Sequence, residues 1–449
     1  MAKNNLKAIS PLDGRYQKRI QDLGNYCSEF GLMKYRLRVE VEYFIALYEF
    51  GIFKVKNTES LYKLRELYLN FTEEDALEIK KIESTTNHDV KAIEYFIKNN
   101  IKGSDLEENS EWIHFALTSQ DINNTAIPLY WKEAINEIYE PLFTSVLTAL
   151  NQKATEWKST PFLTRTHGQA ATPSTLGKEI KVFAYRLEKQ WEAFQQLPHT
   201  GKFGGATGGL NAHYIAFPNK DWDTFSKNFL KNHLGLERQK FTTQIENYDF
   251  LSAQFQNLSR INTILLDFVR DMWTYISQGY FKQLIIKDEV GSSAMPHKVN
   301  PIDFENAEGN IGIANAIWAH FSEKLPISRL QRDLSDSTVL RNLGVPLGHS
   351  LIALNSIVRG LNRIDINKEK IEKVLNDNWT IVAEAIQTIL RREQFPKPYE
   401  ALKDLTRSGN KITKELIHDF ILNLDIKEEI KNELLEISPF NFIGNTDKF

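Results

Sequence analysis

The stretch 244–286 limits the possible fold more than any other part of the sequence. It contains no proline, and its only glycine is Gly279. Apolar residues recur at seven-residue intervals in two rows, Leu251, Leu258, Leu265 and Met272, and Ile261, Phe268 and Tyr275. This pattern is typical of a helix held by neighbouring helices at shallow crossing angles. Such a helix would be about 60 Å long, which favours a helical bundle built across subunits, although a plain coiled-coil scaffold fits the same pattern.

Helical patterns of apolar residues occupy most of the remaining chain, over 29–50, 73–82, 121–158, 174–197, 304–324 and 339–363. We therefore expect an all-α fold. The expected domains are an N-terminal helical domain at 1–118, a central long-helix domain at 119–364 and a small C-terminal helical domain at 365–449. Prolines should kink or restart helices at Pro128 and Pro141 and bend one at Pro346. The glycine-rich stretch 199–213 is expected to form a flexible loop between helices.

Composition excludes several classes of protein. A formal net charge of -3 leaves no basic excess with which to neutralise nucleic-acid phosphates. The single cysteine, Cys27, cannot form an internal disulfide or a thiolate metal cluster. The N-terminus lacks the apolar core of a signal peptide, and no apolar run is long enough for a membrane span. We therefore expect a cytoplasmic protein with no nucleic-acid or membrane partner.

The stretch 291–301, GSSAMPHKVNP, combines a pliable loop with a helix start. Asn300 is suited to cap the helix, and Pro301 to occupy its first position. Ser292 and Ser293 provide hydroxyl groups, and Lys298 adds a mobile positive charge. A loop of this kind before a helix start can bind an anion and can ionise a serine hydroxyl. A simple linker before a capped helix is the alternative.

Other polar clusters also lie at predicted helix starts and turns. Thr86 or Asn87 can cap the helix that begins near Asp89, and His88 is either an ordinary capping-region histidine or a pocket residue. Thr118 and Ser119 begin another helix. His167 precedes Gly168 in a short break, where a histidine can exchange protons near neutral pH or simply stabilise the turn. Three arginines, Arg329, Arg332 and Arg341, bracket the aspartates and serines of 333–337. This pattern suits a phosphate or carboxylate, or surface ion pairs.

Several of these stretches together resemble one enzyme family. GSSAMPHKVNP is similar to the signature loop of the fumarase/aspartase superfamily, and its His297 variant is similar to that of the adenylosuccinate lyases. Further matching stretches follow in the family's order: SPLDGRY at 10–16, TTNHDVKAIEYF at 85–96, HFALTSQDINN at 114–124, RTHGQAATPSTLGKE at 165–179, TTQIE at 242–246 and QRDLSDSTVLRNLG at 331–344. The resemblance covers nearly the whole chain and is to the enterobacterial type of the family.

The resemblance implies a fold, an assembly and a reaction. The family has a three-domain all-α fold whose central helix bundle is shared across a homotetramer, with each site built from three subunits. Its members cleave adenylosuccinate to AMP and fumarate in purine biosynthesis. They also cleave succinyl-aminoimidazole carboxamide ribotide (SAICAR) to the aminoimidazole carboxamide ribotide (AICAR) and fumarate. The reaction is a β-elimination without redox chemistry, so no metal or organic cofactor is implied.

The resemblance also implies roles for individual residues. Ser292 matches the general base and His167 the general acid, with Lys298 stabilising the charge that develops. His88 matches a histidine that contacts substrate. The phosphate end of the substrate would be held by Arg15, Tyr16, Arg332, Ser337 and Arg341. The remainder of the site would be lined by Asn87, Asp89, Thr118, Ser119, Gln244 and Asn300.

Three positions depart from the family pattern. Ala294 stands where close relatives often have threonine. The sequence GGATGG at 204–209 differs from the usual glycine loop of the family, and Pro128 lies where a relative has uninterrupted helix. None is a proposed catalytic group. Two rival functions remain open: a sister lyase acting on argininosuccinate, fumarate or aspartate, and a non-catalytic scaffold that has kept the fold. The arginine–serine cluster and His297 speak against the first, and intact His167, Ser292 and Lys298 against the second.

Overall fold

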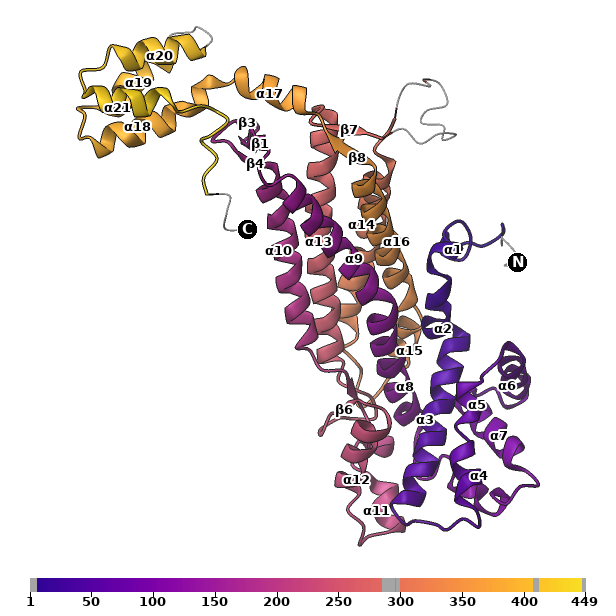
Figure 1. The fold of residues 1–449 in the computed structure, drawn as a ribbon. Helices are drawn as coiled ribbons and strands as arrows, with labels where there is room; N and C mark the ends of the chain where they lie inside the picture. The colour runs from indigo at the N-terminus through magenta and orange to yellow at the C-terminus, as the bar shows by residue number, and fades with distance from the viewer. Residues whose placement is uncertain (1–5, 285–294, 296–298, 407–411, 446–449) are drawn as a thin grey trace. The chain divides into compact units, whose positions relative to one another are not determined.

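The computed structural model describes residues 6–284, 295, 299–406 and 412–445. This part of the chain is mostly helical, and its strands form only short two-stranded pairings (Figure 1). The expected all-α fold class is therefore confirmed. The chain divides into two compact units, the first made of Met1–Thr144, Gln190–Thr263 and Gly309–Asn355 and the second of Ser145–Lys189, Ile264–Glu308 and Ser356–Phe449. The division into three domains expected from the sequence stays a prediction.

Unit 1 contains most of the helices of the first half of the chain. They are α1 (Gln17–Ile20), η1 (Gln21–Leu23), α2 (Gly24–Cys27), α3 (Glu29–Glu49), α4 (Thr58–Lys63), α5 (Glu66–Leu69), α6 (Glu73–Thr86), α7 (Asp89–Ile101), η2 (Glu107–Trp112), α8 (Ser119–Ala134) and η3 (Ile135–Tyr139). Later segments add β5 (Thr200–Gly201), η4 (Gly205–Thr207), α11 (Asn211–Ala216), α12 (Trp222–Asn228), η5 (Phe229–His233), β6 (Glu237–Arg238) and α15 (Ser335–Leu340). Strands β5 and β6 pair in parallel. Helix α3 packs along α8 and α7 and is buried over most of its length.

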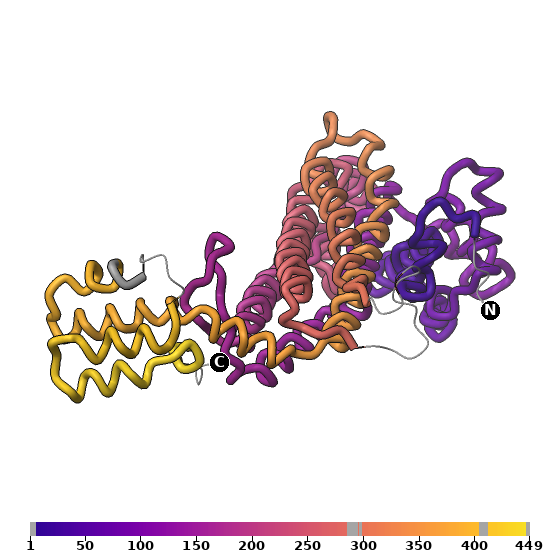
Figure 2. The backbone as a smooth tube through the Cα atoms, turned by 90° about the horizontal axis from the view of Figure 1, so that it is seen from above, coloured from indigo at the N-terminus to yellow at the C-terminus, as the bar shows by residue number. Residues whose placement is uncertain are grey.

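Unit 2 contains three antiparallel pairings and the C-terminal helices. The pairings join β1 (Pro161–Phe162) to β4 (Ser174–Thr175), β2 (Arg165–Thr166) to β3 (Gln169–Ala170), and β7 (Phe281–Gln283) to β8 (Ile364–Ile366). The helices are α17 (Lys368–Asn376), η6 (Trp379–Val382), α18 (Ala383–Arg392), α19 (Pro398–Thr406), α20 (Lys414–Leu422) and α21 (Glu428–Leu435). Helix α18 packs on α19 and α20 on α21, and Figure 2 shows these four helices side by side at the yellow end of the chain.

Long helices begin in one unit and end in the other. They are α9 (Glu140–Glu156), α10 (Leu176–Gln195), α13 (Asp249–Ser277), α14 (Ile302–Lys324) and α16 (Gly344–Asn362). Helix α14 begins at Ile302, one residue later than Pro301, the start expected from the sequence. In the described part of the chain, no helix is both long enough and apolar enough to cross a membrane.

Helix α13 is the long helix expected over 244–286, but it is shorter. Its 29 residues span about 44 Å, so the predicted length of about 60 Å was wrong. At its start Tyr248 has a left-handed backbone with φ of 61°, and at its end Gly279, with φ of 79°, turns the chain toward β7. The heptad row itself is confirmed as a core face, because Leu258, Leu265 and Met272 are almost completely buried.

Pro128 lies inside α8, which continues through it, so the helix does not restart there. Proline has no N–H, so the carbonyl of Asn124 loses its partner within the helix. That carbonyl instead accepts a hydrogen bond from the backbone N–H of Lys202, at 3.2 Å. Pro141 follows the π-helical turn η3 and lies in the first turn of α9, so the helix restarts there as expected.

The helix expected over 339–363 is two helices, α15 and α16. Pro346 lies in the first turn of α16, where its missing N–H would have had no partner within the helix. The bend predicted at Pro346 is therefore replaced by a turn between Leu340 and Gly344.

The glycine-rich stretch 199–213 is packed around a buried carboxylate, and the expectation of a flexible loop was wrong. One oxygen of Asp121 accepts hydrogen bonds from Nζ of Lys202 at 2.7 Å and from the backbone N–H groups of Gly204 and Gly205 at 2.9 and 3.0 Å. Its other oxygen accepts from the backbone N–H of Thr118 at 2.9 Å, which closes the first turn of α8. Gly208, with φ of 83°, has no room for a Cβ, which would lie 2.3 Å from the carbonyl oxygen of Thr242.

Replacing Asp121 by asparagine should strongly destabilise the protein. Asp121 and Lys202 are both fully buried, so Asp121→Asn leaves an ammonium group in the core without its counter-charge. Breaking a buried ion pair in this way costs about 3–5 kcal/mol. Chemical denaturation would measure the loss. The exposed pair of Lys56 and Glu108 provides the control, since Glu108→Gln should change the free energy of unfolding by less than about 1 kcal/mol. Equal effects of the two substitutions would show that Lys202 does not depend on Asp121 for its counter-charge.

Candidate functional site

A polar pocket in unit 1 lies where the junction of α6 and α7, the start of α8 and the helix α15 come together. Its volume of about 390 Å³ is in the range of small-molecule sites. The lining residues are Leu32, Arg36, Glu83, Asn87, His88, Asp89, Ser119, Gln120, Asn123, Ile127, Tyr130, Arg332, Leu334, Ser337, Leu340 and Arg341. Three arginines face two carboxylates among these residues, so the lining has a surplus of positive charge that suits an anion.

Asp89 holds two of the arginines in place. Its Oδ2 accepts from Arg36 at 2.7 Å and from Arg341 at 3.1 Å. Burial alone would raise the pKa of Asp89, but the neighbouring Arg36 and Arg341 outweigh it and lower the pKa below its usual value. The carboxylate therefore stays ionised and fixes Arg36, which is itself buried and also donates to Asn123 at 2.8 Å.

His88 caps helix α7 and at the same time faces the pocket. Its Nδ1 accepts a hydrogen bond from the backbone N–H of Lys91 at 3.1 Å, so His88 is the cap, and the expectation that Thr86 or Asn87 would fill this role was wrong. Asn87 instead ends α6 in a left-handed conformation with φ of 50°, which asparagine tolerates. Because Nδ1 is an acceptor, the neutral ring carries its proton on Nε2, 3.4 Å from the hydroxyl of Ser119.

Arg332 connects the pocket to the glycine-rich loop. Its guanidinium donates to Oε1 of Gln244 at 3.2 Å, and Nε2 of Gln244 donates to the carbonyl of Ala206 at 3.2 Å. Gln244 is thus held between the loop and the arginine. Ser337 lies in the first turn of α15, and Arg341 follows directly after this helix.

The structure gathers most of the polar residues singled out in the sequence and leaves others elsewhere. The pocket brings together Asn87, His88, Asp89, Ser119, Arg332, Ser337 and Arg341, with Gln244 bound to Arg332 and Thr118 next to Ser119. Arg15 and Tyr16 are not among the residues that line this pocket. Arg15 is exposed, and the ring of Tyr16 contacts Arg19. Ser292 and Lys298 lie outside the described residues.

The remaining candidates belong to unit 2. His167 is exposed at the turn of the β2–β3 hairpin, where His167 and Gly168 both have positive φ, of 54° and 75°. Two successive positive φ values match the tight turn that connects short antiparallel strands. Asn300 precedes α14. Among the residues that the structure describes, no group of three or more histidine, cysteine, aspartate or glutamate side chains is placed to hold a metal ion.

Several lining residues were missed in the sequence, and Arg36 is the most important. It lies on α3 among buried apolar residues, with only 5% of its surface exposed. A charged residue inside an apolar helical stripe requires a buried partner, so its position was a usable signal. Glu83, Asn123 and Tyr130 gave no comparable signal, because their helix faces look ordinary in the sequence.

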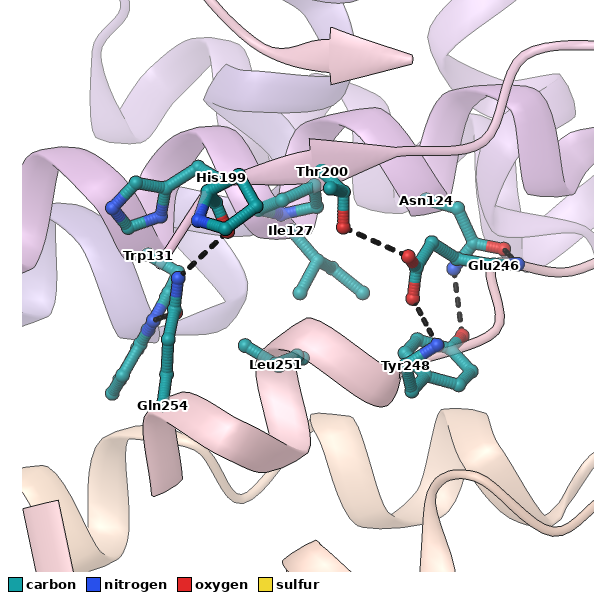
Figure 3. A pocket seen from close by; sticks show the side chains of 11 residues that line it. Asn124, Ile127, Trp131, His199, Thr200, Glu246, Tyr248, Leu251 and Gln254 are labelled. Carbon is teal, nitrogen blue, oxygen red and sulfur yellow. Dashed lines mark hydrogen bonds between the residues drawn. The ribbon is translucent and has the colours of Figure 1, made fainter. Parts of the chain in front are cut away.

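A second, much smaller cavity lies beside α8 and the start of α13. Figure 3 shows the carboxyl group of Glu246 directed toward Thr200 and Tyr248, with His199 farther along the same wall. Glu246 accepts from the hydroxyl of Thr200 at 2.9 Å and from the backbone N–H of Tyr248. Burial raises the pKa of Glu246 to about 7 and lowers the pKa of His199 to about 4. Both groups are therefore held toward their neutral forms.

Glu246 should make the protein less stable as the pH rises. Its folded-state pKa lies above the ordinary glutamate value of 4.5, so its contribution is fully present below about pH 4.5 and is lost as the pH passes 7. The loss is on the order of 3 kcal/mol. Glu246→Gln mimics the protonated form and should remove this part of the decline.

Denaturation at about pH 5 and about pH 8 would measure the effect. The exposed residue Glu237 supplies the control, because Glu237→Gln should keep the decline of the unmodified protein. If Glu246→Gln loses as much stability over this interval as the unmodified protein does, Glu246 is not the group responsible.

Comparison with known proteins finds matches over almost the entire chain. A family model described as "Lyase" matches residues 14–315, and one described as "Adenylosuccinate lyase C-terminal" matches residues 328–443. The protein named adenylosuccinate lyase of Dictyostelium discoideum is 57% identical, covering 98% of this chain and 97% of its own. Those of Haemophilus influenzae and Escherichia coli strain K12 are 48% and 46% identical, each covering 99% of this chain and 98% of its own.

Solved structures with the same fold are more distant in sequence. The 3-carboxy-cis,cis-muconate lactonizing enzyme from Pseudomonas putida has a TM-score of 0.75 at 19% identity, covering 95% of this chain and 94% of its own. A fumarate lyase from Mesorhizobium sp. BNC1 has a TM-score of 0.74 at 17% identity, covering 95% of each chain. At these identities the likeness establishes the fold alone.

Proposed function

This chain belongs to the adenylosuccinate lyase family, and from that premise we propose that it cleaves adenylosuccinate to AMP and fumarate and SAICAR to AICAR and fumarate. It is a carbon–nitrogen lyase of purine biosynthesis. The observation that carries the assignment to a nucleotide substrate is the pocket of unit 1, which combines Arg332, Arg341 and Ser337 around a cavity of nucleotide-compatible size. Arginine forks and a serine hydroxyl are suited to bind a phosphate group.

The proposed reaction is an elimination that needs one base and one acid. Ser292, as the alkoxide, removes the proton from the carbon beside a carboxylate of the succinyl group. The electron pair of that C–H bond forms the new double bond, and the C–N bond breaks with its pair remaining on nitrogen. His167 donates a proton to that nitrogen, which releases fumarate. Each positioned proton transfer typically accelerates such a step about 10²–10⁴-fold.

Serine is a poor base in water, so the proposal requires groups that stabilise its alkoxide. Lys298 supplies the positive charge, and the amides of the loop and the start of α14 supply hydrogen bonds and a favourable dipole. The same groups would stabilise the charge that develops on the substrate carboxylate. No metal or organic cofactor enters this chemistry.

Binding roles follow from the pocket and from the family pattern. We assign the phosphate end to Arg332, Ser337 and Arg341, together with Arg15 and Tyr16. The rest of the substrate would contact Asn87, Asp89, Thr118, Ser119, Gln244 and Asn300. His88 presents its Nε2–H beside Ser119 and would orient the succinyl carboxylate or His167.

We further propose that the protein is a cytoplasmic homotetramer whose sites each combine three subunits. Large apolar side chains remain exposed on the long helices, which supports burial against other copies of the chain. They include Tyr185 on α10, Trp273 on α13, and Ile302 and Ile313 on α14, with exposed fractions between 43% and 57%. The family pattern, in which catalytic groups come from different subunits, adds to this support.

Release of fumarate from adenylosuccinate tests the function and the two catalytic roles together. The unmodified protein should release fumarate from adenylosuccinate and from SAICAR. His167→Ala and Ser292→Ala should each lower kcat by about a hundredfold or more, because each removes one proton transfer. Fumarate absorbance measures turnover, and size-exclusion chromatography checks that the oligomer is intact.

His418→Gln serves as the control, because His418 packs against Trp379 in the C-terminal helices and has no proposed catalytic role. Turnover near that of the unmodified protein in either catalytic variant would remove that residue from its role. Failure with adenylosuccinate combined with turnover of a sister substrate, such as argininosuccinate, would overturn the proposed function.

Mixing the two inactive variants tests the shared sites. Subunits of His167→Ala and Ser292→Ala, dissociated and reassembled together, should regain activity that neither variant has alone. Some sites in the mixed oligomers would then combine His167 from one subunit with Ser292 from another. Turnover before and after reassembly is the measurement. Absence of any recovery, with mixed oligomers demonstrated by mass spectrometry, would place both residues of a site in one chain.

A further inference from the structure

Helix α15 positions two of the proposed phosphate ligands. It contains six residues, including Ser337, and Arg341 follows it directly. A helix this short has no independent stability in water, so its orientation depends on tertiary contacts. Its buried side chains are Asp336 and Leu340. The apolar contacts of Leu340 have no preferred direction and would allow α15 to rotate. The hydrogen bonds of the Asp336 carboxylate are directional and fix the orientation of the helix.

The carboxylate of Asp336 is bound by the hydroxyl of Tyr248. The phenol Oη donates to Oδ2 of Asp336 at 2.9 Å, and both side chains are almost completely buried. The other carboxylate oxygen of Asp336 accepts from the backbone N–H of Ser337 at 2.7 Å. One carboxylate therefore connects Tyr248 directly to the backbone of a pocket residue.

Tyr248 is itself held rigidly from two sides. Its Oη accepts from Nδ2 of Asn124 at 2.7 Å, and the Oδ1 of Asn124 accepts from the backbone N–H of Glu246 at 3.0 Å. The backbone N–H of Tyr248 donates to the carboxyl of Glu246 (Figure 3). Tyr248 has a φ of 61°, a strained value for a residue with a side chain. Such strain persists where surrounding contacts enforce it, often next to functional sites.

We propose that Tyr248 is a positioning residue for the phosphate end of the substrate. Through Asp336 its hydroxyl fixes the orientation in which α15 presents Ser337 and Arg341 to the pocket. Tyr248 does not touch the reacting atoms. Its loss should therefore weaken binding of the phosphate-bearing part of the substrate and leave the elimination step largely intact. This inference rests on the proposed function for the identity of the ligand.

Tyr248→Phe removes the hydroxyl and keeps the ring. We expect the dissociation constant for AMP, measured by calorimetry, to rise about tenfold, as for the loss of one hydrogen bond to a charged group. The KM for adenylosuccinate should rise by a similar factor, while kcat changes by less than about threefold. The constant for inhibition by fumarate, which has no phosphate, should not change. A general loss of structure would instead weaken AMP and fumarate alike.

Tyr139→Phe is the matched control. Tyr139 is also fully buried, but its hydroxyl has no hydrogen-bond partner within the described residues. This substitution should leave the affinity for AMP and the KM unchanged. Thermal melting of both variants checks that they fold.

Asp336→Ala removes the acceptor of the same hydrogen bond and tests the positioning role if Tyr248→Phe does not fold. It should weaken AMP binding by a similar factor. The variant that carries both Tyr248→Phe and Asp336→Ala should lose no more affinity for AMP than either single variant. Unchanged AMP affinity in Tyr248→Phe or Asp336→Ala, or fully additive losses, would overturn the inference. AMP binding requires no turnover. If the protein fails to cleave adenylosuccinate while Tyr248→Phe still weakens AMP binding, the proposed function fails and the positioning role stands.

Discussion

The buried carboxylate of Asp121 joins the separate parts of unit 1 on which the pocket depends. One of its oxygens closes the first turn of α8, where Thr118 and Ser119 lie, and the other binds Lys202 and the backbone of the glycine-rich loop. The loop then offers the carbonyl of Ala206 to Gln244, which in turn accepts from Arg332. Because a buried charge requires its partners, loss of Asp121 would disturb both the start of α8 and the glycine-rich loop.

The fold class could be predicted from the sequence because helical periodicity is a local signal. The heptad row of Leu258, Leu265 and Met272 identified α13 and its buried face. Its ends were misjudged because they depend on single backbone conformations at Tyr248 and Gly279, which periodicity does not encode. The glycine-rich loop was misjudged for a different reason. The glycine content suggests a flexible backbone. Asp121, which is distant in the sequence, instead fixes the loop by accepting hydrogen bonds from the backbone N–H groups of Gly204 and Gly205.

The sequence predicted part of the candidate pocket, but the buried Arg36 was missed. Polar residues at helix starts, such as His88 and Ser119, are visible in the sequence because helix ends have recognisable chemistry. The position of Arg36 in the middle of an apolar helix signals that it needs a buried partner, but the sequence does not show that this partner is Asp89 from another helix. Pairing across distant segments is a property of the three-dimensional arrangement. The roles of Ser292 and Lys298 rest on resemblance to the family, since both lie outside the described residues.

Pro128 shows how a residue that disrupts hydrogen bonding within a helix can create a connection outside it. Because Pro128 has no N–H, the carbonyl of Asn124 lacks its usual partner within α8, and the backbone N–H of Lys202 donates to it instead. The side chain of Asn124 meanwhile binds Glu246 and Tyr248. Asn124 thus serves three neighbours at once, two through its amide and one through its main chain. A regular helix would have occupied that main-chain acceptor itself, so an irregularity in α8 makes Asn124 a junction between segments far apart in the chain.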